Sequence, residues 1–126
     1  MRIRLMLVLA AVLVASGCAT SPTAAKGANA QLALGVKAAE RGYWQEALFR
    51  FRRADAARPQ DAQTLNNVAV ALEALGRYDE ALETYKKALQ LAPKNAIIRR
   101  NYARFAEFFT SYARGAKPKE ETRENR

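Results

Sequence analysis

The stretch Leu75-Gly76-Arg77-Tyr78-Asp79-Glu80-Ala81-Leu82 decides the fold, because an earlier part of the chain repeats its pattern 34 residues upstream. Gly42 falls on Gly76, and Glu46-Ala47-Leu48 falls on Glu80-Ala81-Leu82. The match continues at three further pairs of positions: Phe51 with Tyr85, Ala54 with Ala88, and Pro59 with Pro93. The chain therefore contains two copies of one structural unit.

Each copy has the apolar periodicity of two helices. In the second copy the apolar residues between Leu65 and Leu75 recur every three or four positions, and those between Leu82 and Leu89 do the same. Gly76 separates the two stripes, and Pro93 ends the second helix. Small residues on the second helix, Ala81 and Ala88, predict close contact between antiparallel helices.

The 34-residue period and the A-x₃-F…P pattern resemble the tetratricopeptide repeat family. The resemblance assigns residues 30–61 to a first repeat and residues 62–95 to a second. It implies an all-α fold in which helix-turn-helix repeats stack into a short solenoid. It also implies that the domain binds other proteins.

The segment 96–114 is predicted to be a capping helix that covers the open end of the second repeat. Its apolar stripe consists of Ile98, Tyr102, Phe105, Phe109 and Tyr112. Two repeats and this cap make five helices. The following segment, 115–126, is charged and lacks large apolar residues, so it is predicted to be disordered.

The start of the chain has the features of an export signal. Arg2 and Arg4 precede an apolar stretch, 5–15, that would rise about 16 Å as a helix, against roughly 30 Å of hydrocarbon core. Small residues then lead to Cys18, the single cysteine. We expect residues 1–17 to be a signal peptide and residues 18–29 to be a flexible, lipidated tether.

The segment 13–18 resembles the lipobox of bacterial lipoproteins, which implies that Cys18 carries a diacylglycerol and a third, amide-linked acyl chain. Two or more chains anchor a protein stably, whereas one does not. Ala19 stands where an Asp would signal retention in the inner membrane, so the resemblance favours the periplasmic face of the outer membrane. A lipidated Cys18 is available neither for a disulfide nor as a nucleophile.

Composition argues against catalysis and against nucleic acid as a partner. The chain has no histidine, and its carboxylates read as solvated helix positions, so we expect no enzyme activity, no cofactor and no metal site. The net charge of +9 would suggest nucleic-acid binding in a cytoplasmic protein, but export removes that partner. Arg52-Arg53 and Lys86-Lys87 form a predicted basic ridge, which either contacts anionic lipid, peptidoglycan or an acidic partner or is simply a solvated face.

By the geometry of the family, the first helix of each repeat lines a concave groove that binds an extended peptide or a helix. Asn67 and Asn101 share one repeat position and are candidates to hold peptide backbone, while Arg100 and Arg104 are candidates to pair with a carboxylate. In the first repeat the implied lining is Asn29, Leu32 and Val36. The rest of the predicted groove consists of Gln63, Asn66, Asn67, Val70, Glu73, Ile97, Arg100, Asn101, Arg104 and Phe108.

Ile97 and Phe108 lie off the core stripe of the last helix, where a plain cap should be polar. They either contact the core or bind a partner, and we favour a partner or a second copy of the chain. Trp44 is matched by Tyr78 in the second repeat and is interpreted as structural.

Three functions fit these features. The first is a membrane-anchored adaptor or scaffold that binds an envelope protein. The second is a pilotin-like assembly factor for the secretin of a type IV pilus or secretion system. The third is a minor structural lipoprotein without a dedicated ligand.

Overall fold

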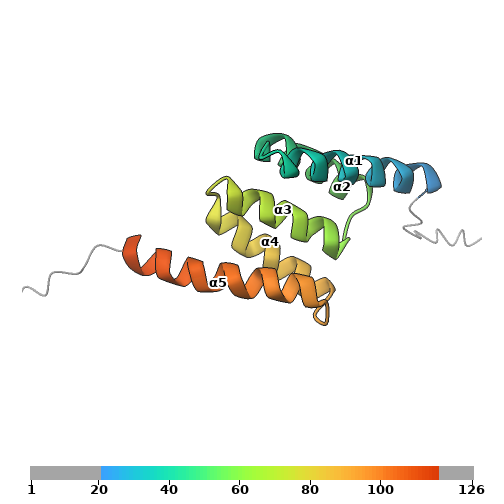
Figure 1. Cartoon of the computed structure of the whole chain (residues 1–126). Coiled ribbons are helices and arrows are strands. Elements are labelled where there is room, and N and C mark those ends of the chain that lie inside the picture. The colour runs from blue at the N-terminus through green and yellow to red at the C-terminus, as the bar shows by residue number, and fades with distance from the viewer. Residues whose placement is uncertain (1–20, 117–126) are drawn as a thin grey trace, which may run out of the picture.

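A computed structural model describes residues 21–116, which form five α-helices connected by short turns. The helices are α1 (Pro22–Glu40), α2 (Trp44–Ala57), α3 (Ala62–Ala74), α4 (Tyr78–Leu91) and α5 (Ala96–Ala116). The pairs α1/α2 and α3/α4 are antiparallel hairpins that stack on one another, and α5 lies outermost against α3 and α4 (Figure 1). The predicted all-α architecture of two helix-turn-helix repeats and a last helix is confirmed.

The turns inside the two repeats have the same geometry at the same repeat positions. Gly42 and Gly76 adopt φ values of 76° and 74°, a region that favours glycine. In the first turn the N–H of Tyr43 donates to the carbonyl of Ala38 at 2.9 Å, and in the second the N–H of Arg77 donates to that of Leu72 at 2.9 Å. Each glycine therefore ends the first helix of its repeat and reverses the chain into the second.

The helices that open the second repeat and the last segment are capped alike. Asp61 accepts hydrogen bonds from the N–H groups of Gln63 and Thr64 ahead of α3, and Asn95 accepts those of Ile97 and Ile98 ahead of α5. Burial raises the pKa of the Asp61 carboxyl, but these backbone hydrogen bonds and the Arg58 guanidinium outweigh it and lower the pKa below its ordinary value.

The prediction of a flexible tether over residues 18–29 is wrong for residues 22–29, which belong to α1. Gly27 stands at the repeat position of Asp61 and Asn95 and has no side chain to cap a helix there. The helix instead continues toward the N-terminus until Ser21, whose hydroxyl accepts a hydrogen bond from the N–H of Ala24 at 3.2 Å, with Pro22 in the first turn. The predicted signal peptide, Cys18 and the tail beyond Ala116 lie outside the described residues.

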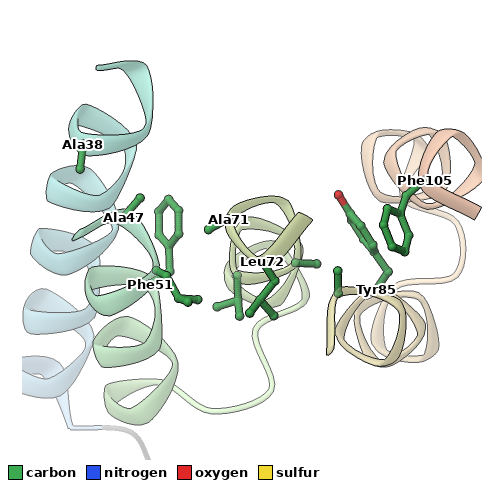
Figure 2. Packing of buried hydrophobic residues seen from close by; sticks show 11 residues of the cluster. Ala38, Ala47, Phe51, Ala71, Leu72, Tyr85 and Phe105 are labelled. Carbon is green, nitrogen blue, oxygen red and sulfur yellow. The ribbon is translucent and has the colours of Figure 1, made fainter. Parts of the chain in front are cut away.

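The core runs along the stack and draws on every helix (Figure 2). Phe51, Leu72, Tyr85 and Phe105 are its large members, each at most 3% exposed. The small residues at the predicted helix crossing, Ala81 and Ala88, have no exposed surface, and neither do their equivalents in the first repeat, Ala47 and Ala54. Close helix approach at these alanines agrees with the prediction.

The predicted capping stripe on α5 is buried over only part of its length. Ile98 and Phe105 are buried, Tyr102 and Phe109 are half-buried, and Tyr112 is 48% exposed. The 21 residues of α5 exceed the 14 of α4, so its last turns run beyond the helix pair that it covers (Figure 1). Tyr112 still contacts Tyr78 of the second repeat, so the last member of the stripe packs on this repeat while half of its surface stays exposed. No helix of residues 21–116 has the length and apolarity needed to cross a membrane.

Candidate functional site

The candidate site is a pocket of about 370 Å³ between α3 and α5, closed at one end by the first residues of α2 and α4. Val70, Glu73, Arg104 and Phe108, all predicted to line the groove, meet in this pocket. Trp44, Ala74 and Tyr78 complete the lining.

Two lining residues of the pocket, Glu73 and Arg104, form a polar chain with the buried Tyr85. The hydroxyl of Tyr85 donates a hydrogen bond to Oε2 of Glu73 at 2.9 Å, and Nη2 of Arg104 lies 3.2 Å from the same oxygen. Burial, followed by the hydrogen bond to Glu73, raises the pKa of Tyr85 well above its ordinary value, so its hydroxyl stays protonated as the donor. This contact fixes Glu73 from below and leaves the Arg104 guanidinium exposed in the groove.

The wall of the pocket is aromatic. The rings of Tyr78 and Phe108 meet edge to face with their centroids 5.0 Å apart, and those of Tyr78 and Tyr112 do so at 4.9 Å. Phe108 is 44% exposed although it contacts Tyr78. Apolar surface is therefore open to solvent directly beside the charged Arg104.

Three residues of this pocket lie outside the predicted groove: Trp44, Ala74 and Tyr78. Trp44 and Tyr78 are the first residues of α2 and α4, and both contact the core while reaching the pocket. Trp44 therefore has a structural role, as predicted, and it also lines the pocket. The two residues occupy the same position in the two repeats, directly after the turn between the helices. This shared position is the sequence signal that could identify both.

The other predicted groove residues are distributed along α3 and α5. Asn66 is buried, and its Oδ1 accepts a hydrogen bond from Nδ2 of Asn101 at 3.1 Å, so these amides hold α3 to α5. Arg100 lines a different pocket, at the outer side of α5. Gln63 and Ile97 are exposed, and Asn67 is half-buried.

In the first repeat, Asn29 accepts a hydrogen bond from Arg58 at 3.1 Å, Leu32 packs against the core, and Val36 is 42% exposed.

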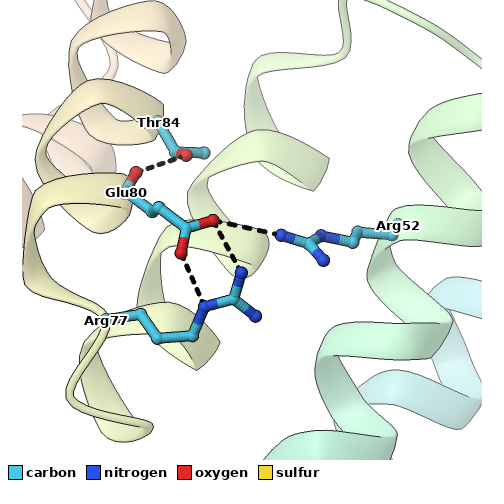
Figure 3. A network of polar contacts seen from close by, with 4 residues as sticks. All are labelled: Arg52, Arg77, Glu80 and Thr84. Atoms are coloured by element: carbon cyan, nitrogen blue, oxygen red, sulfur yellow. Dashed lines mark hydrogen bonds and ion pairs between the residues drawn. The ribbon is translucent and has the colours of Figure 1, made fainter.

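Two of the four residues of the predicted basic ridge, Arg52 and Lys86, pair with acidic neighbours. Glu80 accepts two hydrogen bonds of 2.7 Å from Arg77 and lies 3.5 Å from Arg52, so it bridges α2 and α4 (Figure 3). The hydrogen bonds from Arg77 hold the pKa of Glu80 below its ordinary value. Lys86 pairs with Glu83 at 2.9 Å. The other two, Arg53 and Lys87, form no ion pair with another residue of the range 21–116.

These helices and their groove define a helical-repeat solenoid, a class of proteins that present extended surfaces to partners. Residues 62–95 match the tetratricopeptide repeat family. Domains of this family are in general non-catalytic modules for protein–protein interaction. No curated protein matches the chain in sequence.

Solved structures with the same fold include tetratricopeptide domains. The Arabidopsis OM64 TPR domain has a TM-score of 0.65 and 19% sequence identity over 71% of this chain and 74% of that one. A point mutant of MamA has a TM-score of 0.59 and 25% identity over 71% of this chain and 65% of its own. MamA MSR-1 has a TM-score of 0.58 and 26% identity, with 71% of this chain and 51% of that one covered. This chain thus spans about half to two thirds of the length of the MamA chains.

Proposed function

We propose that this protein is a non-enzymatic adaptor of the bacterial envelope that is anchored to the outer membrane at Cys18. Its groove binds a peptide or helix of another envelope protein. The observation that carries the proposal is the pocket between α3 and α5, where open aromatic surface adjoins Arg104, whose side chain is 62% exposed while it pairs with Glu73. Such a combination suits a segment with an apolar side chain next to a carboxylate.

The groove is preorganised for this task. Tyr85 and Glu73 are fixed by their hydrogen bond, and Tyr78 is held between Phe108 and Tyr112. A partner would therefore order few side chains of this protein when it binds, which lowers the entropic cost of association.

Replacing Phe108 by serine tests the groove. A photo-crosslinking amino acid at Val70 should capture the partner in intact cells, and Phe108→Ser should reduce this product at least about tenfold, because a pocket-lining aromatic side chain of an interface commonly contributes more than about 1.4 kcal/mol.

The matched control is Leu91→Ser, since Leu91 is 43% exposed and Phe108 44%, and Leu91 lies outside this groove. Equal loss in both variants, or no loss in Phe108→Ser, would contradict the role of the pocket.

The anchoring proposal gains a geometric limit from the position of α1. Three residues separate Cys18 from Pro22, the first residue of α1, so at most about 14 Å of extended chain connects the lipidated residue to the folded domain. A domain tethered in this way stays beside the membrane, and partners would be recruited to that surface.

Replacing Cys18 by serine is expected to remove the lipid and to move the folded domain from the membrane fraction to the soluble fraction. Incorporation of a labelled fatty acid and fractionation of cells measure the two effects, and circular dichroism verifies the helical fold. Phe108→Ser should remain in the membrane fraction, which separates anchoring from partner binding. Continued membrane association of processed Cys18→Ser would overturn the anchoring proposal.

A further inference from the structure

Among the described residues, none covers the outer face of α5 at the repeat position that a second helix covers in the two complete repeats. Gly35, Ala69 and Ala103 occupy equivalent positions in α1, α3 and α5. Gly35 and Ala69 are buried, whereas Ala103 is exposed. In each complete repeat a second helix packs on this position, and within residues 21–116 no such helix follows α5.

In each complete repeat, the second helix covers this position with an aromatic side chain. Phe51 of α2 lies so close to Gly35 that a Cβ on this glycine would stand 2.4 Å from the ring. Tyr85 of α4 holds the equivalent position in the second repeat and has no exposed surface. A helix that completed the third unit would place an aromatic residue over Ala103.

The carboxylate that accepts the hydrogen bond of this aromatic residue in the second repeat also has an equivalent on α5. Tyr85 donates its hydroxyl hydrogen bond to Glu73, and Glu107 stands one repeat further on, exposed on α5. The third unit thus offers a tyrosine both a small residue to pack on and a carboxylate to bond.

The equivalent space beside α5 is a slot of about 680 Å³ between α4 and α5. Its apolar lining includes Leu89, Pro93, Tyr102 and Ala103. Arg99 and Arg100 lie at its edge, and neither forms an ion pair with another residue of the described range 21–116. Arg99 occupies the position of Leu65, which is half-buried in α3.

We propose that this slot, which is separate from the groove, binds an acidic amphipathic helix of a partner protein with a tyrosine over Ala103. The apolar wall and the two arginines require a helix with an apolar stripe and an acidic flank. A second copy of this chain suits the slot poorly, because the chain carries a net charge of +9 and α5 has four arginines and one glutamate.

A synthetic peptide tests the proposal without knowledge of the natural partner. The peptide has the sequence of α4, Tyr78–Leu91, with glutamate in place of Lys86 and Lys87, so that it keeps the helical register and the tyrosine equivalent to Tyr85. A helix of 14 residues is marginal in water, so binding to the purified full chain should raise the helical circular dichroism of the mixture above the sum of the components. Fluorescence anisotropy of the labelled peptide gives the affinity.

Three changes should each weaken this binding at least about tenfold, corresponding to about 1.4 kcal/mol. In the peptide, alanine replaces the tyrosine that is equivalent to Tyr85. In the protein, Ala103→Gln fills the slot without adding charge, and Arg99→Gln with Arg100→Gln removes the cations. Ser111→Gln, an exposed position on the groove side of the same helix, and Phe108→Ser should leave the affinity unchanged.

Equal binding by wild type and Ala103→Gln would overturn the proposal, as would equal binding of the original lysine-containing peptide. Sedimentation of the chain alone gives an independent check, because a dimer that Ala103→Gln dissociates would identify a second copy as the occupant and reject the acidic partner. Loss of peptide binding in Phe108→Ser would assign the peptide to the groove instead.

Discussion

Replacing Tyr85 by alanine should lower the free energy of unfolding by about 3–5 kcal/mol, the range for removing a large buried aromatic side chain. Tyr85 has no exposed surface, and its ring lies 5.4 Å from that of Phe105 on α5. The substitution would therefore open a cavity between the second repeat and the last helix, and it would also leave Glu73 without its tyrosine donor. Urea denaturation followed by circular dichroism measures the change.

Two further tyrosine variants separate the contribution of packing from that of the hydrogen bond and from the effect of removing any tyrosine. Tyr85→Phe keeps the ring and loses only the hydroxyl, so we expect a loss of about 1 kcal/mol and a folded protein. Tyr43→Ala, at a side chain that is 63% exposed, should change stability by at most about 0.5 kcal/mol. If Tyr85→Ala were no less stable than Tyr43→Ala, the ring would not hold α5 to the second repeat.

The part of the fold that the sequence predicts well is the part governed by local chemistry repeated at a fixed spacing. Gly42 and Gly76 end helices because both adopt a positive φ, and Asp61 and Asn95 begin helices because their side chains accept backbone N–H groups. These features act within a few residues, so they can be read without knowledge of the tertiary structure. The helix boundaries in the second repeat follow from them.

The errors arise where a prediction depended on composition or on distant contacts. Small and polar residues predict a tether over residues 18–29, although Ser21 followed by Pro22 is a helix-start signal. Tyr112 belongs to the predicted stripe and contacts Tyr78 of the second repeat, but its partial exposure depends on how far α4 extends beside α5, which no local sequence pattern shows.

The candidate site is likewise only partly predictable. Register along α3 and α5 places Val70, Glu73, Arg104 and Phe108 on one side, and the structure brings them to one pocket. Register alone does not show which polar side chains form hydrogen bonds with each other instead of with a partner. Asn66 and Asn101 bond together across α3 and α5.

Replacing Gly35 by alanine should lower the free energy of unfolding by about 1–3 kcal/mol, because the added methyl group overpacks the α1–α2 contact. A Cβ at this position would lie 2.4 Å and 2.6 Å from two ring carbons of Phe51. Phe51 is only 3% exposed, so its ring has little room to move away. In an unconstrained helix the same substitution would stabilise the protein by about 0.5–1 kcal/mol, so steric overlap must exceed this gain.

Gly27 supplies the matched control on the same helix. A Cβ there meets no atom within 4 Å, so Gly27→Ala should raise the free energy of unfolding by about 0.5–1 kcal/mol. Opposite signs for these two substitutions in urea denaturation would attribute the cost at Gly35 to the ring of Phe51. Phe51→Leu alone should destabilise the protein, yet it should reduce the penalty of Gly35→Ala, because the smaller side chain leaves space for the methyl group. Strictly additive effects in this double-mutant cycle would show that Phe51 is not what requires glycine at position 35.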